Sequence, residues 1–175
     1  MMAINPTSSI PDSIQRIANA PDRRIAWEFF VFFSRFEYAL KRHQRYLMPG
    51  VGDAQPNWDR FASDYAAEFR PRSSPALQTA VEFYVAQPPR KQLRDQGEMN
   101  WSDPQVWNGS EPQLIWLLRV IRTVRNNLFH GGKFPLMPVA EPSRDRDLIA
   151  NGLEVLKGAL ALDPSVQRHF FEGLE

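Results

Sequence analysis

Residues 22–47, DRRIAWEFFVFFSRFEYALKRHQRYL, decide the fold, because their apolar side chains recur with the periodicity of a helix. Asp22 is a typical N-cap residue, and Met48-Pro49-Gly50 is a typical stop. One face of the predicted helix, within about 80° on the helical wheel, collects a stripe that we expect to form core. The stripe consists of Ile25, Phe29, Phe32, Phe36, Leu40, His43 and Leu47.

A second apolar stripe lies beside the first and consists of Trp27, Phe30 and Phe33. A helix with two apolar stripes needs more than one packing partner. We therefore expect this helix to pack on several neighbours or across a subunit interface.

Further helices are predicted over residues 57–69, 75–86, 110–130 and 143–162, with a short one from Asp163-Pro164 and a possible helical turn over 13–19. Residues 90–109 are polar and contain Gly97, Pro104 and Gly109, so an ordered loop is expected there. No stretch alternates as a half-buried strand would. The prediction is an all-α fold, a bundle of four to five helices with short flanking helices and one long ordered loop. We expect a single domain over residues 1–175 with its core at about 22–162.

The amino-acid composition excludes several classes of function. The 175 residues carry a formal net charge of +1, which argues against a surface coated in positive charge, but 17 of the 21 basic residues are Arg. Such a bias is typical either of genome composition or of a local phosphate site. The chain has no Cys, and its three dispersed His residues form no recognisable metal motif, so we predict neither metal nor cofactor. Without a signal peptide or a membrane-length apolar run, a cytoplasmic location is expected.

Polar and apolar residues are sorted most sharply in the helix predicted over 110–130. Its core face consists of Leu114, Leu117, Ile121, Val124 and Leu128, and its opposite face of Arg119, Arg122, Asn126 and His130. Arg125 lies about 60° from the centre of the core stripe, between Leu118 and Phe129, and needs a partner there. Arg119, Arg122 and Arg125 are spaced by three residues, so their charges repel one another unless anions bind to them. Either the chain's own acids, such as Glu37, or an incoming phosphate fits that role.

The end of this helix reads Arg125-Asn126-Asn127-Leu128-Phe129-His130-Gly131-Gly132-Lys133, which resembles the R-x4-H signature of the HEPN superfamily. Residues 34–41, SRFEYALK, are similar to the first helix of some of these proteins. Many HEPN members are metal-independent ribonucleases of toxin and antiviral systems. The resemblance covers about residues 22–162, and its motif match is confined to the helix that ends at His130.

The resemblance implies RNA cleavage by attack of the 2′-hydroxyl on the adjacent phosphorus. It implies that His130 is the general base or acid, that Arg125 clamps the phosphate and that Asn126 orients either group. Glu37 is expected to support Arg125, while Arg119, Arg122 and Lys133 are expected to contact RNA. Members commonly form homodimers in which two motifs face one cleft, and an antitoxin or other defence protein is a possible partner. The second stripe of the first helix, with Leu118 and Phe129, is the expected contact surface.

One position departs from the family pattern, and several alternatives stay open. Some members carry, two residues after the His, a tyrosine whose modification silences the toxin, and here that position is Gly132.

The residues of the motif also fit a catalytically silent RNA- or nucleotide-binding module, or a protein-interaction scaffold. A His at a helix C-terminus can simply offset the helix dipole. We expect His43 to lie in the core and His169 to pack at the terminus, whereas Trp101 and Trp107 either stack on bases or anchor the loop.

Overall fold

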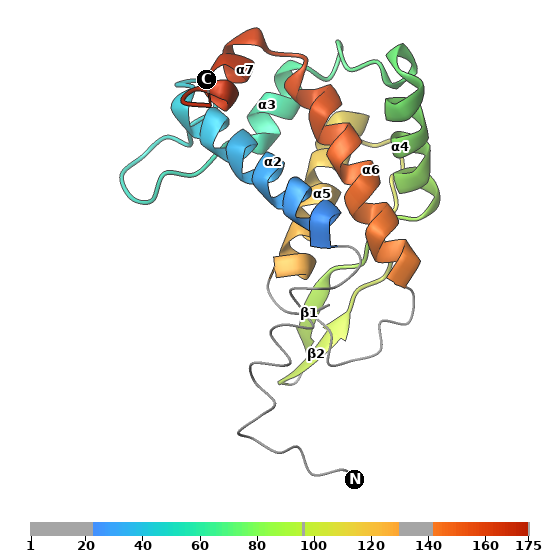
Figure 1. Cartoon of the computed structure of the whole chain (residues 1–175). Coiled ribbons are helices and arrows are strands. Elements are labelled where there is room, and N and C mark those ends of the chain that lie inside the picture. The colour runs from blue at the N-terminus through green and yellow to red at the C-terminus, as the bar shows by residue number, and fades with distance from the viewer. Residues whose placement is uncertain (1–22, 96, 130–141, 175) are drawn as a thin grey trace.

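The computed structural model describes residues 23–95, 97–129 and 142–174, and this part of the chain is mostly helical (Figure 1). The predicted helical turn at 13–19 lies outside the described residues. The helices are α2 (Arg23–Arg42), α3 (Trp58–Asp64), α4 (Pro75–Ala86), α5 (Gln113–Phe129), α6 (Pro142–Leu160) and α7 (Pro164–Phe171), with a short 3-10 turn at Pro71–Ser73. The all-α class is thereby confirmed.

Local capping explains why three helices begin where the sequence predicts. The Asn57 side chain accepts a hydrogen bond from the Arg60 amide at 3.0 Å and begins α3. Ser74 precedes Pro75 at the start of α4, and the Asp163 carboxylate accepts bonds from the first amides of α7 at 2.8 and 3.1 Å. These signals lie within a few residues of each helix, so the sequence alone reveals them.

Helix α2 ends at Arg42, five residues earlier than predicted. The helical pattern continues to Leu47, but the backbone turns at His43 and the Met48 amide donates to the Gln55 carbonyl at 2.9 Å. Leu47 forms an isolated bridge with Pro56 and is 37% exposed, so its predicted place in the core is wrong. Pairing with a distant segment has replaced the last predicted turn of helix.

A β-hairpin lies within the predicted loop. Strand β1 (Gln92–Asp95) pairs antiparallel with β2 (Glu98–Trp101), with Gln92 opposite Trp101 and Asp95 opposite Glu98. Gly97 has φ +91°, a conformation that glycine adopts readily in tight turns. The prediction of a long loop without strands is therefore wrong here, although the hairpin is a small part of the fold.

Helix α6 packs against α2, α4, α5 and α7, and it runs between α2 and α4 in Figure 1. Gly152 on α6 allows this close packing. A Cβ atom there would lie 2.8 Å from the Tyr84 hydroxyl of α4 and 3.1 Å from the Phe29 ring of α2. The Tyr84 hydroxyl donates a 2.6 Å hydrogen bond to the Leu148 carbonyl within this contact. The buried apolar side chains of all these helices form one hydrophobic core.

Candidate functional site

The buried face of α5 is the one that the sequence predicts. Leu114, Leu117, Ile121 and Val124 are buried, and Leu128 packs against them at the edge of the core. The core thus holds α5 in one rotation about its axis, which places Arg119, Arg122 and Asn126 toward solvent. Leu118 is 2% exposed, so it belongs to the core and does not offer the surface for a dimer contact that the sequence suggested.

Arg119 and Arg122 are both paired with carboxylates of the chain. Arg119 binds Glu111 through two hydrogen bonds, and these raise the pKa of the guanidinium above its usual value. Arg122 Nη2 lies 3.1 Å from Asp59 Oδ1 on α3. The sequence left two kinds of partner open for the Arg residues of this helix, namely acids of the chain or an incoming phosphate. For Arg119 and Arg122 the partners are acids of the chain. The acids are Glu111 and Asp59 and not Glu37.

Arg125 differs from both. Its guanidinium carbon lies 5.6 Å from the centroid of the Phe33 ring, and its Nη1 donates to the Asn126 side-chain oxygen at 3.1 Å. Among the described residues no carboxylate pairs with Arg125, and Glu37, one helical turn beyond Phe33 on α2, is not bonded to it. The Phe33 ring and the Asn126 amide are therefore the contacts of the Arg125 guanidinium within the described part of the chain.

The remaining motif residues, His130, Gly131, Gly132 and Lys133, lie outside the described residues, and α5 is described up to Phe129. The structure therefore brings together Arg125, Asn126 and the Phe33 ring. It places Arg119 and Arg122 in separate ion pairs.

Asn127, next to Asn126, is a buried polar residue that the predicted site does not include. Its side chain is 6% exposed, and its Nδ2 donates to the Arg90 carbonyl at 2.8 Å, which ties the segment before β1 to the last turn of α5. Asn127 follows Trp116 and Val120 on an apolar face of the helix. A polar residue in such a row needs a buried partner, and that signal was present in the sequence.

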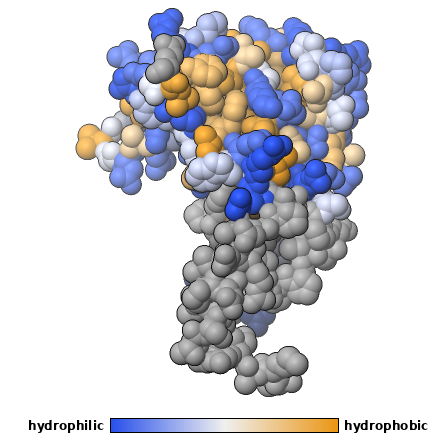
Figure 2. Space-filling view, in the orientation of Figure 1, coloured by the Kyte–Doolittle hydropathy of each residue, from blue (hydrophilic) through white to orange (hydrophobic). Residues whose placement is uncertain are grey.

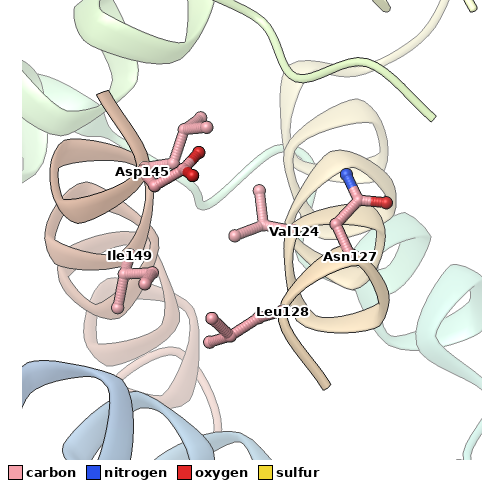
Figure 3. Close-up of a pocket in the computed structure, with 6 residues that line it drawn as sticks. Val124, Asn127, Leu128, Asp145 and Ile149 are labelled. Carbon is pink, nitrogen blue, oxygen red and sulfur yellow. The ribbon is translucent and has the colours of Figure 1, made fainter. Parts of the chain in front are cut away.

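A small hollow beside Asn127 separates α5 from the start of α6 (Figure 3). It has room for about one water molecule. The lining residues are Val124, Asn127, Leu128, Asp145, Leu148 and Ile149. A hollow of this size is too small for a nucleotide, and Arg125 is not among the residues that line it.

The two tryptophans of the predicted loop lie in different parts of it. Trp107 Nε1 donates to the Glu111 carbonyl at 3.0 Å, and its ring lies 6.3 Å from that of Trp116, so Trp107 anchors the segment to α5. Trp101 lies on β2. The anchoring alternative therefore holds for Trp107.

The other two histidines, His43 just after the C-terminal end of α2 and His169 on α7, lie close together. The His43 ring stacks on Tyr46 and lies 6.3 Å from the His169 ring, and His43 Nδ1 is buried without a hydrogen-bond partner among the described residues. His169 Nδ1 lies 3.6 Å from Glu172. His43 is thus partly buried at the edge of the fold and is not a member of the core, whereas His169 packs near the C-terminal end of the described chain.

In the described ranges no group of three or more His, Asp or Glu side chains is arranged to hold a metal ion. None of the helices described combines the length and apolar character that a membrane span requires. Comparison of the chain with protein-family models found no match, and comparisons with curated proteins and with solved structures found none either.

Proposed function

We propose that the chain is a metal-independent endoribonuclease of HEPN type that cleaves single-stranded RNA. The observation that supports this most is the contrast within α5. Arg119 and Arg122 are neutralised by carboxylates, whereas Arg125, the Arg of the R-x4-H motif, contacts only an aromatic ring and an amide among the described residues. A cation held in place without a counter-charge is suited to bind a phosphate.

In the proposed reaction the 2′-hydroxyl attacks the adjacent phosphorus, and the bond from phosphorus to the 5′ oxygen of the next nucleotide breaks. Arg125 stabilises the negative charge on the non-bridging oxygens, and Asn126 orients the guanidinium through the 3.1 Å hydrogen bond. His130 removes the proton of the 2′-hydroxyl or protonates the leaving oxygen, since an imidazole exchanges protons near neutral pH. The products are a 2′,3′-cyclic phosphate and a 5′-hydroxyl.

One imidazole does not readily serve both sides of an in-line displacement, so we propose a homodimer in which two copies of the motif share a cleft. The helices then form a HEPN-type bundle, and the enzyme acts in the cytoplasm in a toxin or antiviral setting. Control by an antitoxin or another defence protein fits this setting. With Gly132 in place of the modifiable tyrosine, that control uses another residue.

The proposal is tested by incubating the full chain with single-stranded RNA in EDTA. Arg125→Ala is expected to slow cleavage by roughly 10²–10³-fold and His130→Ala by roughly 10²–10⁴-fold. Arg122→Ala is the matched control, because it removes an Arg of the same helix that is already paired with Asp59. Wild-type products must end in the cyclic phosphate. Equal cleavage by wild type and the two motif variants overturns the proposal, and binding without cleavage favours the silent binding module.

A further inference from the structure

The second apolar stripe of α2 runs from solvent to Arg125. Trp27 is 63% exposed and stacks on the half-buried Phe30 with ring centroids 5.6 Å apart. Phe33, one turn further, is 2% exposed and lies beneath the Arg125 guanidinium. The predicted stripe is therefore a row of aromatic rings that begins on the surface and ends at the candidate site.

The outer face of α2 continues this row along the helix axis. Val31 is 40% exposed and Tyr38 is 36% exposed, and together with Trp27 and Ser34 they recur at spacings of four, three and four. On the side of the molecule that carries α2, orange side chains lie beside strongly blue ones (Figure 2). Trp27, Phe30, Val31, Ser34 and Tyr38 are called the outer face of α2 below.

Cations lie at both ends of the outer face. Helix α2 carries Arg23, Arg24, Arg35, Lys41 and Arg42 against two carboxylates, Glu28 and Glu37. Arg24 lies 3.5 Å from Glu28, and Arg42 lies 3.6 Å from Glu172, the residue that follows α7. Both pairs are about half exposed or more, and exposed pairs of this kind contribute little to stability. Arg35 donates to the Phe170 and Glu172 carbonyls and lies 4.9 Å from the Tyr38 ring centroid.

This charge pattern decides what fits the outer face. A second copy of α2, whether parallel or antiparallel, would place cationic ends against cationic ends. A suitable partner combines negative charge with flat rings that stack on Trp27 and Tyr38. Single-stranded nucleic acid has both properties, because its phosphates pair with Arg and Lys and its bases stack on aromatic side chains.

We propose that the outer face of α2 binds single-stranded RNA and leads it along Trp27 and Phe30 to Arg125. Bases stack on Trp27, and phosphates bind Arg24 at one end and Arg42 at the other. Trp27 and Tyr38 are about 16 Å apart along the helix axis, the length of about five stacked nucleotides. The choice of RNA over other polyanions rests on the proposed ribonuclease function.

The probe is a fluorescein-labelled 12-nucleotide oligouridine with 2′-O-methyl groups, which lacks the attacking hydroxyl and so stays intact with the wild-type chain. Binding is measured by fluorescence anisotropy. Trp27→Ala is expected to raise the Kd about tenfold, the effect of one lost base–aromatic stack, and Trp27→Phe to retain most of the affinity. Phe171→Ala is the control, because Phe171 is an exposed aromatic residue of α7 and is expected to leave the Kd unchanged.

The charge contribution is measured from the salt dependence of the same Kd. Arg24→Gln with Arg42→Gln is expected to reduce the slope of log K against log salt by about 1.4, or about 0.7 for each phosphate contact. Arg70→Gln with Arg72→Gln removes the same charge between α3 and α4 and should leave the slope unchanged. No binding, an unchanged Kd for Trp27→Ala, or equal slopes for the two double variants overturns the inference. So does a change of oligomeric state in Trp27→Ala, which would make the outer face an interface between copies.

Cleavage of unmodified RNA separates this inference from the proposed function. If the chain binds the probe through Trp27 but does not cleave RNA, the ribonuclease proposal fails and the binding face stands. If cleavage depends on Arg125 while Trp27→Ala leaves both Kd and KM unchanged, the ribonuclease proposal stands and the binding face fails.

Discussion

Arg125 shows how the neighbours of an arginine decide what it can do. A guanidinium that already donates to a carboxylate must give up that bond before it binds a phosphate, and this applies to Arg119 and Arg122. The Phe33 ring holds Arg125 by its face and leaves N–H groups at its edge. The three Arg residues are therefore equivalent in sequence spacing but not in chemistry.

The sequence predicted part of this site. The helical wheel placed Arg125 near the core stripe and indicated that it needs a partner. The identity of the partner was not predictable, because the Phe33 ring reaches Arg125 only through the packing of α2 and α5. The acids that pair with Arg119 and Arg122 come from the segment before α5 and from α3, and the helical wheel of α5 alone does not reveal them.

Asp64 carries a pH-dependent contribution to stability. Arg45 donates two hydrogen bonds to its carboxylate and Arg60 Nε lies 3.2 Å away, and the Arg45 bonds above all lower the pKa of Asp64. A carboxylate with a lowered pKa stabilises the fold above its unfolded pKa of about 3.9, and this stabilisation is lost as pH falls through the folded value. Asp64→Asn is expected to reduce the free energy of unfolding by about 1 kcal/mol at pH 7, and by less at pH 2.5.

Urea unfolding at both pH values measures this difference. Asp53→Asn, in the exposed loop before α3, is the control and should match wild type. A deficit for Asp64→Asn that does not shrink in acid would contradict the assignment.

At the scale of the elements, local signals predicted most helices and failed where distant segments intervene. The prediction for residues 75–86 coincides with α4, since Ser74-Pro75 and Pro88-Pro89 punctuate both ends. The hairpin was not predicted because its strands, QLRD and EMNW, contain no β-branched residue and so show little strand propensity. Gly97 was the only sign of a turn between them. The strands form through pairing with each other, and propensity alone did not predict them.

Gly152 controls the close contact of α6 with α2 and α4. Gly152→Ala would place a methyl group 2.8 Å from the Tyr84 hydroxyl and 3.1 Å from the Phe29 ring, so we expect a loss of about 1–3 kcal/mol in the free energy of unfolding. Gly158→Ala should cost less, because the new methyl meets the end of the Leu77 side chain, which can move. Urea unfolding of both variants gives the comparison.

A double-mutant cycle identifies the clashing atom. In a Tyr84→Phe background the hydroxyl is absent, so Gly152→Ala should cost less than it does in wild type. The same cost in both backgrounds would show that the Tyr84 hydroxyl is not what Gly152 makes room for.

At the scale of the whole molecule, the many Arg residues fall into two groups with different surroundings. Arg35, Arg45 and Arg122 hold elements together through carbonyls and carboxylates, which is a structural use of the planar guanidinium. Arg24 and Arg42 lie at the ends of the outer face of α2 in exposed pairs, and Arg125 has no carboxylate in the described part of the chain. The net charge of +1 conceals this division, because it does not show which Arg residues are paired with acids of the chain.

The proposed shared cleft makes catalysis a property of two chains, and mixing experiments measure this directly. In a mixture of wild type with a ninefold excess of the His130→Ala chain, subunit exchange leaves about a tenth of the wild-type copies in wild-type homodimers. If each cleft needs both imidazoles, cleavage falls about tenfold relative to wild type alone. The same excess of an unrelated protein of similar charge controls for RNA sequestration. A monomeric enzyme, or a dimer with two independent sites, would keep its activity in the mixture, because each wild-type copy would still carry everything that the reaction needs.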